Sequence, residues 1–274
     1  MAVAAFGSVR SCGVTTLALG LAATWPEGRR VLLVEADPAG GTLAAAADWP
    51  VEPSLVSLAA AARRGGDPAL VGEHCHRLPG GAAVLAAPPL GDQARGALGM
   101  LAELLRRLGE LEGDVLIDCG RLDAGSPVMA VWERADRPIL VARPRLADLQ
   151  ALAAWLEGRT VDGSLRLVTV GDGPYADSEI AETLRLEVLA RLPWDPGAAD
   201  ALTLVAASAR QMRLAPLVRS VRTLADELTD APPAAASAIR PMPELIRLGI
   251  RILRARRSNT ASHVNGSIAQ ETER

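Results

Sequence analysis

The hydrophobic positions of this chain form short continuous runs, separated by longer stretches in which apolar residues recur at helical spacing. The short runs are apolar on successive residues, as strands covered on both faces of a parallel sheet must be. They predict strands over residues 2–6, 31–35, 82–87, 115–118, 139–142, 165–170 and 188–192.

The stretches between these runs have the spacing of helices. In one of them the leucines at 98, 101, 104, 105 and 108 repeat along one helical face. The pattern predicts helices over residues 15–24, 97–111, 146–157, 178–184 and 217–228. Alternating strands and helices indicate a doubly wound α/β fold, with a mostly parallel sheet and helices on both faces.

The pattern changes near residue 230, which predicts one domain over residues 1–230. Residues 231–243 are rich in Ala and Pro and are typical of a linker. Residues 244–257 have helical spacing with many arginines, and the polar residues 258–274 have the composition of a disordered tail.

The predicted helix over 244–257 is amphipathic and basic. Its apolar side comprises Leu245, Ile246, Leu248, Ile252 and Leu253, and its other side comprises Arg247, Arg251 and Arg254. One interpretation is an interfacial anchor that makes peripheral contact with the inner face of a membrane. The other is a helix that packs its apolar side on its own domain or on a partner protein.

Composition narrows the class of protein. All 29 basic residues are arginines, and the net charge of −3 predicts no general affinity for nucleic acid. Three widely spaced cysteines favour a reducing compartment over a disulfide framework. No apolar run approaches the roughly 20 residues that span a bilayer. Since the apolar N-terminus is interpreted as a buried strand, we expect a cytoplasmic protein.

The loop after the first predicted strand has candidate chemistry. A strand, a loop of small residues and a threonine at the start of a helix point backbone N–H groups at a phosphate. A working P-loop ends Gly-Lys-Ser/Thr, where the lysine reaches the terminal phosphates and the hydroxyl binds Mg²⁺. Here Gly13 and Thr15 occupy the matching places, and Val14 occupies the place of the lysine.

Further segments follow in a set order. One strand is followed by the acidic pair Glu35 and Asp37, another ends at Asp118, and residues 192–196 read Leu-Pro-Trp-Asp-Pro. With Ala-Asp-Arg-Pro-Ile-Leu-Val at 135–141, these segments resemble the ParA/MinD family of P-loop ATPases, from about residue 2 to residue 228. The resemblance implies that family's fold, and ATP or ADP with Mg²⁺ as its ligand.

The chain departs from the family at both lysines. The family has one at the usual P-loop position and another five residues earlier, which reaches across an ATP-sandwiched dimer; these positions are Val14 and Val9 here. The small residues at the centre of the loop are replaced by Arg10 and Ser11. Arg10 could bind phosphate through its planar fork, or it could be a solvated loop charge.

Other positions of the chain match the site residues of the family. By resemblance, Thr15, Asp37 and Asp118 would bind Mg²⁺, mostly through water, and Glu35 with Asp37 would position the attacking water. By the same resemblance, the chain at residues 194–196 would run beside the adenine base of the nucleotide. The predicted nucleotide-binding residues are Arg10, Ser11, Cys12, Gly13, Val14, Thr15, Thr16, Trp194, Asp195 and Pro196.

Loss of the lysines has a chemical consequence. Removing one preorganised donor from such a site costs about 10²–10³ in rate, so little hydrolysis is expected, and binding of ATP or ADP with Mg²⁺ is expected to be weak or lost. We therefore expect a pseudo-ATPase that works as a positioning or regulatory binding module. Its protein partner would be a second copy, or a competent homologue in a heterodimer. The alternative is a weak Mg²⁺-dependent ATPase switch, in chromosome partitioning, septum placement, or secretion or pilus positioning.

Overall fold

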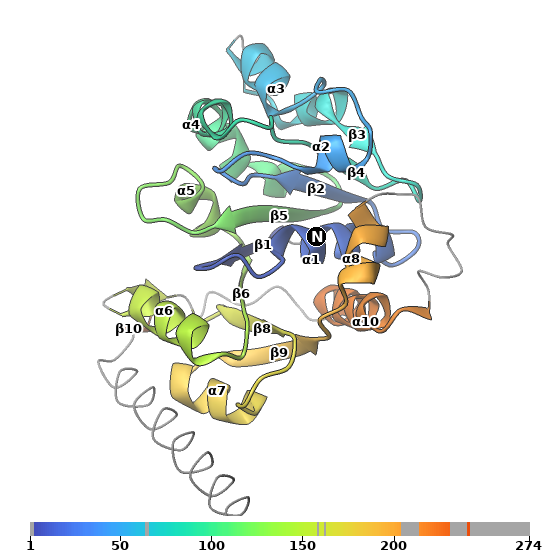
Figure 1. The fold of residues 1–274 in the computed structure, drawn as a ribbon. Helices are drawn as coiled ribbons and strands as arrows, with labels where there is room; N and C mark the ends of the chain where they lie inside the picture. The colour runs from blue at the N-terminus through green and yellow to red at the C-terminus, as the bar shows by residue number, and fades with distance from the viewer. Residues whose placement is uncertain are drawn as a thin grey trace, which may run out of the picture.

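The centre of the molecule is an eight-stranded sheet of order β3-β4-β2-β5-β1-β6-β8-β9 (Figure 1). The computed structural model describes residues 3–63, 66–157, 159–161, 163–203, 214–230 and 240–241. The strands are β1 (Val3–Ser8), β2 (Val31–Glu35), β3 (His76–Arg77), β4 (Ala83–Leu85), β5 (Asp114–Arg121), β6 (Arg137–Ala142), β8 (Arg166–Val170) and β9 (Glu187–Leu192). Every pair is parallel except β3 with β4, which confirms the predicted fold class.

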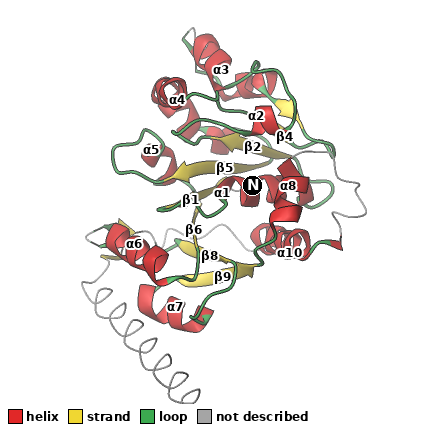
Figure 2. Cartoon of the chain, viewed as in Figure 1, coloured by secondary structure: helices red, strands yellow, loops and turns green. Residues whose placement is uncertain are grey.

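Helices cover both faces of this sheet (Figure 2). One face packs against α3 (Leu55–Ala62), α4 (Gly91–Arg106), α5 (Met129–Trp132), α6 (Leu146–Leu156), α7 (Asp177–Leu184) and the 3₁₀ turns η1 (Pro68–His74) and η2 (Leu108–Glu110). The other packs against α1 (Val14–Thr24), α2 (Leu43–Ala46), α8 (Pro196–Thr203) and α10 (Pro216–Asp230).

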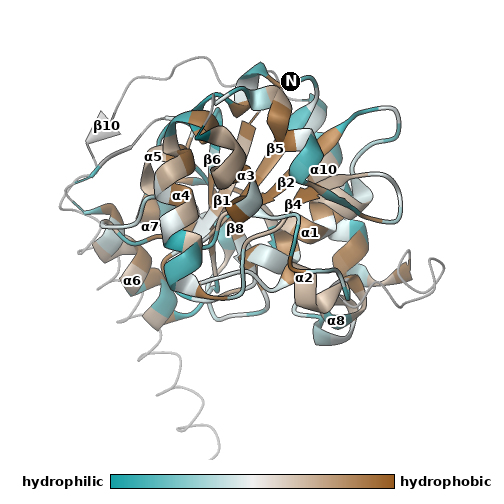
Figure 3. Ribbon diagram, turned by 90° about the horizontal axis from the view of Figure 1, so that it is seen from above, coloured by the Kyte–Doolittle hydropathy of each residue, from teal (hydrophilic) through white to brown (hydrophobic). Residues whose placement is uncertain are grey.

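The central strands explain why the apolar runs are continuous. Successive residues of β1 point to opposite faces, so Ala5 belongs to the core under α4 and Phe6 to the core under α1. Both side chains are fully buried. Viewed from above, the strands form a hydrophobic band between the helical layers (Figure 3).

Several element boundaries differ from the predictions. The strand predicted to end at Asp118 continues to Arg121, paired with β1. The helix predicted over 97–111 is α4, which begins at Gly91, followed by η2. The first turn of α4, Gly-Asp-Gln, gives no apolar periodicity, so the sequence did not indicate it. The short elements β3, α2, α3, α5 and α8 were also not predicted.

The chain after α10 is described only at Arg240–Pro241 (β10), which pairs antiparallel with Thr160–Val161 (β7). These two residues fall inside the predicted linker. The rest of that linker, the predicted basic helix over 244–257 and the predicted tail over 258–274 lie outside the described residues. In the described part of the chain, no helix is both long and apolar enough to cross a membrane.

Candidate functional site

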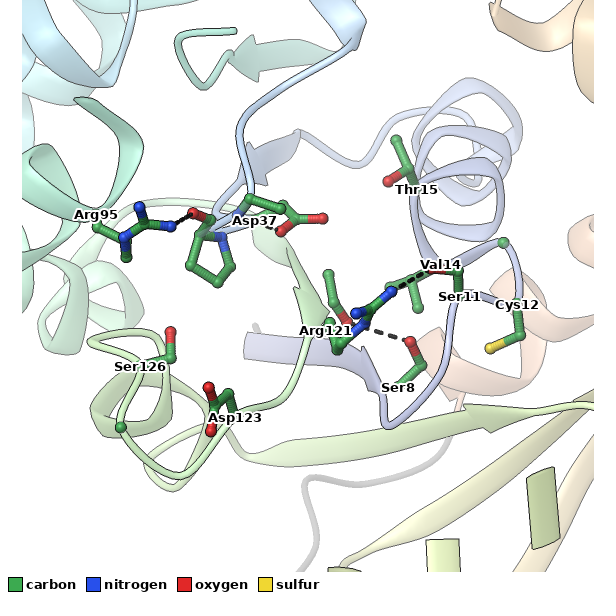
Figure 4. A pocket seen from close by; sticks show the side chains of 15 residues that line it. Ser8, Ser11, Cys12, Val14, Thr15, Asp37, Arg95, Arg121, Asp123 and Ser126 are labelled. Carbon is green, nitrogen blue, oxygen red and sulfur yellow. Dashed lines mark hydrogen bonds between the residues drawn. The ribbon is translucent and has the colours of Figure 1, made fainter. Parts of the chain in front are cut away.

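A pocket of about 470 Å³ opens where the loop between β1 and α1 faces the ends of β2 and β5 (Figure 4). In a parallel sheet, this carboxyl edge of the strands is the usual place for a ligand. The pocket is lined by Ser8, Ser11, Cys12, Gly13, Val14, Thr15, Asp37, Pro38, Ala39, Arg95, Gly120, Arg121, Asp123, Gly125 and Ser126. The structure therefore brings the predicted loop together with Asp37.

The loop presents the first turn of α1 to this pocket. Gly13 precedes the helix in the left-handed region, with φ 94°, and no side chain caps the helix. The first N–H groups of a helix have no partner within it, so an uncapped start can donate to an anion. The local backbone has the form that a phosphate-binding loop requires.

Neither lysine position can supply charge to the pocket. Val14 is 5% exposed and packs in the core beneath α1, with part of its surface in the pocket wall. Val9 is half-buried and packs against the opposite core. Both positions hold aliphatic side chains that stabilise the two cores.

Asp118 is a buried acid beside the pocket. Its side chain is fully buried, and its Oδ1 accepts a hydrogen bond from the Gly120 N–H at 2.9 Å. Its Oδ2 has no hydrogen-bond partner among the described residues. Burial above all, with the nearby charges of Glu35 and Asp37, raises the pKa of Asp118 to about 7, while the Thr15 hydroxyl opposes the rise.

The unpartnered Oδ2 is what a bound cation would satisfy, so the residues present fit Mg²⁺. No group of three or more His, Cys, Asp or Glu in the described residues is arranged to hold a metal alone. Mg²⁺ commonly takes one or two carboxylates and completes its shell with water and substrate phosphates. Thr15, Asp37 and Asp118 are the residues that would bind it, with the nucleotide supplying further oxygens.

Asp37 lines the pocket and is held by its surroundings. Its Oδ1 accepts a hydrogen bond from the Ala39 N–H at 2.8 Å. Gly120, at φ 55°, lies against it so closely that a Cβ there would be 2.1 Å from the carboxylate carbon. Burial raises the pKa of Asp37, and the positive charge of Arg121 acts in the opposite direction.

Glu35 lies outside the pocket lining, and its two oxygens accept hydrogen bonds from backbone amides. Oε1 accepts from Thr42 at 2.7 Å and Leu43 at 3.1 Å, and Oε2 accepts from Ala87 at 3.0 Å. The side chain is 1% exposed, and burial raises its pKa. In this structure Glu35 fixes the backbone beside the pocket, and its predicted part in hydrolysis stays a prediction.

Of the other predicted loop residues, Arg10 lies outside the pocket, whereas Ser11 and Cys12 line it. Arg10 is not part of the pocket lining: its side chain is 59% exposed and lies 3.9 Å from Asp148. Ser11 lines the pocket, and the buried Cys12 donates from Sγ to the Val141 carbonyl at 3.1 Å. Burial raises the pKa of Cys12 to about 11, so it is a packed thiol rather than a nucleophile.

The predicted base-binding segment forms a second, smaller pocket of about 100 Å³. Cys12 and Gly13 line both pockets, so the two pockets adjoin at the loop, and Thr16 lines only the second. Trp194, Asp195 and Pro196 line this apolar slot with Thr16, and their contact with a base stays a prediction. Asp195 also accepts from the Ala198 N–H at 2.9 Å, at the start of α8. The structure thus brings residues 12–16 and 194–196 together.

Two cationic residues of the pocket were not among the predicted site residues. Arg95, in the first turns of α4, donates to the Pro38 carbonyl at 3.0 Å. Arg121, the last residue of β5, donates from Nη2 to Ser11 Oγ at 2.9 Å. The signal for Arg121 was its place three residues after Asp118; Arg95 gave none, since its helix was predicted to begin after it.

Comparison with known proteins gives structural matches alone: no protein-family model and no curated protein sequence matches the chain. The ParA family ATPase of Chlorobium tepidum matches with a TM-score of 0.68 at 16% identity, over 82% of this chain and 98% of that one. MinD of Pyrococcus horikoshii, complexed with Mg-ADP, matches with a TM-score of 0.65 at 19% identity, over 84% of this chain and 96% of that one. Apo McdA of Cyanothece matches with a TM-score of 0.61 at 17% identity, over 84% of this chain and 99% of that one.

At these identities the matches establish the fold, which is that of the ParA/MinD-like P-loop ATPases. Val3–Ser8 and Val14–Thr24 form the strand and helix on either side of the loop, and Asp118 lies in the buried part of the neighbouring strand β5. The arrangement can donate backbone N–H groups to phosphate and carboxylate oxygens to a cation. It cannot place a lysine on the phosphates, because the chain contains none.

Proposed function

Starting from the fold shared with the ParA and MinD ATPases, we propose that this chain is a catalytically impaired protein of that kind. It works as a positioning or regulatory module and retains weak binding of Mg²⁺ with ATP or ADP. The observation that supports this most directly is Val14, a 5% exposed aliphatic residue at the helix start, where the fold's ATPases have a lysine.

The proposal follows from what the pocket keeps and lacks. The uncapped start of α1, Thr15 and the free oxygen of Asp118 suit a Mg²⁺-nucleotide. When bound, Mg²⁺ would neutralise charge on the phosphate groups. Thr15 and Asp118 would orient that ion, while Glu35 keeps the neighbouring backbone in place. Without either lysine, much of the stabilisation needed during phosphoryl transfer is missing.

A module of this kind acts through partners. One solved structure with this fold is a MinC:MinD cell division complex from Aquifex aeolicus, at 12% identity and a TM-score of 0.57. For this chain we propose a protein partner, either a second copy or a competent homologue. Peripheral membrane contact through residues 244–257 is part of the same proposal, and rests on sequence alone.

The second candidate is a slow Mg²⁺-dependent ATPase switch. Retained Thr15, Asp37 and Asp118 favour it, because these are the groups that would orient Mg²⁺ and water. The two candidate functions differ in the rate of ATP hydrolysis and not in nucleotide binding. Binding and hydrolysis must therefore be measured on one preparation.

The test combines calorimetric titration with a hydrolysis assay. ATP and ADP are titrated with and without Mg²⁺ into the full chain and into Asp118→Ala, and phosphate release is then measured at saturating ATP. We expect weak binding that requires Mg²⁺ and Asp118, with hydrolysis at background. Release well above the Asp118→Ala rate would favour the switch. No heat at millimolar nucleotide would exclude retained nucleotide binding.

A further inference from the structure

We infer that Arg121 is the phosphate-binding cation of the pocket, in place of the lysine missing at Val14. Its ligand is a polyphosphate, the terminal phosphates of a nucleoside di- or triphosphate or the same group as free pyrophosphate. This inference rests on the proposed nucleotide site and adds the residue that gives it affinity.

The backbone fixes where Arg121 lies. β5 continues past Asp118, and Arg121 pairs with Ser8 of β1 after a shift of register. The next residue, Leu122, donates its N–H to the Ser8 carbonyl at 2.8 Å. The Leu122 side chain fills the space beside Gly7, where an added Cβ would lie 2.6 Å from Leu122 Cγ. Packing and hydrogen bonds therefore set the position from which the Arg121 side chain extends.

The side chain of Arg121 extends over the loop. Figure 4 shows it between Asp37 on one wall and Ser8 and Ser11 on the other. Nη2 donates to Ser11 Oγ at 2.9 Å, which is the one hydrogen bond of its guanidinium within the described residues. The remaining N–H donors face a pocket whose floor is the uncapped start of α1. A guanidinium with free donors above such a floor matches a phosphate group.

The other arginines nearby suit this role less well. Arg95 lines the pocket on the side away from the loop and is bound to the Pro38 carbonyl at 3.0 Å. Arg10, the cation predicted from the sequence, is outside the lining and lies near Asp148. Of the cations in the described part of the chain, Arg121 alone both lines the pocket and contacts the loop.

The inference is tested by titrating ATP, ADP and pyrophosphate, each with Mg²⁺, into the wild type and three arginine variants. Arg121→Gln keeps a donor for Ser11 without the charge, and Arg121→Lys keeps the charge without the fork. Arg222→Ala, an exposed position on α10, is the matched control. Thermal melting of each variant shows that it is folded.

Loss of a charged hydrogen bond to phosphate predicts about tenfold to a hundredfold weaker binding for Arg121→Gln, with partial recovery in Arg121→Lys. The same loss with pyrophosphate would place the contact on phosphate rather than on the base. Unchanged affinity in a folded Arg121→Gln would overturn the inference and leave the nucleotide site standing. Absence of binding to the wild type would overturn both, so the two failures are distinguishable.

Discussion

Replacing Asp118 with asparagine is expected to stabilise the unliganded protein at pH 8 and to change little near pH 4. In the folded chain the pKa of Asp118 is raised from 3.8 to about 7 by burial and by the charges of Glu35 and Asp37. Between these pH values the folded state keeps a proton that the unfolded state releases. Stability is therefore lost as the pH rises through this window.

The magnitude follows from the width of that window. Each pH unit costs about 1.4 kcal/mol, so the ionised carboxylate destabilises the fold by about 4 kcal/mol above pH 7. Asparagine has no proton to lose and keeps an oxygen for the Gly120 N–H. The advantage of the variant should grow by about 3 kcal/mol between pH 5 and pH 8.

Urea unfolding of both proteins at pH 5 and pH 8, without Mg²⁺ or nucleotide, measures this difference. Asp123→Asn is the control, because Asp123 is an exposed carboxylate on the same pocket. The difference in unfolding free energy between Asp123→Asn and the wild type should not grow between pH 5 and pH 8. An Asp118→Asn difference that is the same at both pH values would refute the reasoning, since the penalty would then not come from ionisation.

Three further predictions concern the pocket and its surroundings. Val14→Lys should strengthen ATP binding about tenfold or more in calorimetry, with Val14→Met as the uncharged control; equal affinities would show that charge at this position is not limiting. Gly120→Ala should destabilise the fold by about 2–4 kcal/mol in urea, because φ is 55° and the new Cβ meets a carboxylate. Gly125→Ala, with open space around it, should stay near the wild type, and equal losses would contradict this explanation. Cys12 and Cys119 should resist iodoacetamide at pH 8 in the folded protein, since burial raises both pKa values and covers both thiols. Mass spectrometry that finds rapid modification of either would show that its cover opens.

The sheet could be predicted from sequence because burial on both faces produces a distinctive pattern. Strands such as Val31–Glu35 are apolar at nearly every position, and that signal needs no tertiary information. The positions of the loop and of Asp118 were also predictable. Each lies near the carboxyl end of a parallel strand, and those ends lie at the same edge of the sheet. Edge strand β3 and the helices α2 and α5 have too few residues to show the spacing of a strand or a helix.

The roles of particular site residues depended on contacts that sequence cannot give. Arg10 is closer in sequence to the loop's centre, yet Arg121, more than a hundred positions away from Ser11, reaches the loop. β5 extends to Arg121 because Cys-Gly-Arg can pair with β1 although it is not an apolar run. Glu35 was assigned to chemistry by its resemblance to the family's acidic pair, and the sequence could not indicate its hydrogen bond to the Ala87 amide, 52 positions away.

Glu35 also has a mechanical consequence for the pocket. Its carboxylate joins the end of β2, the start of α2 and the segment after β4 through hydrogen bonds to backbone amides. Displacing any one of these segments would break a bond to a buried acid and strain the other two at the same time. We therefore expect this part of the backbone to stay fixed when a ligand binds, and motion should be sought instead in the segment from Asp123 to Ser126, beyond the pairing of Arg121 with Ser8.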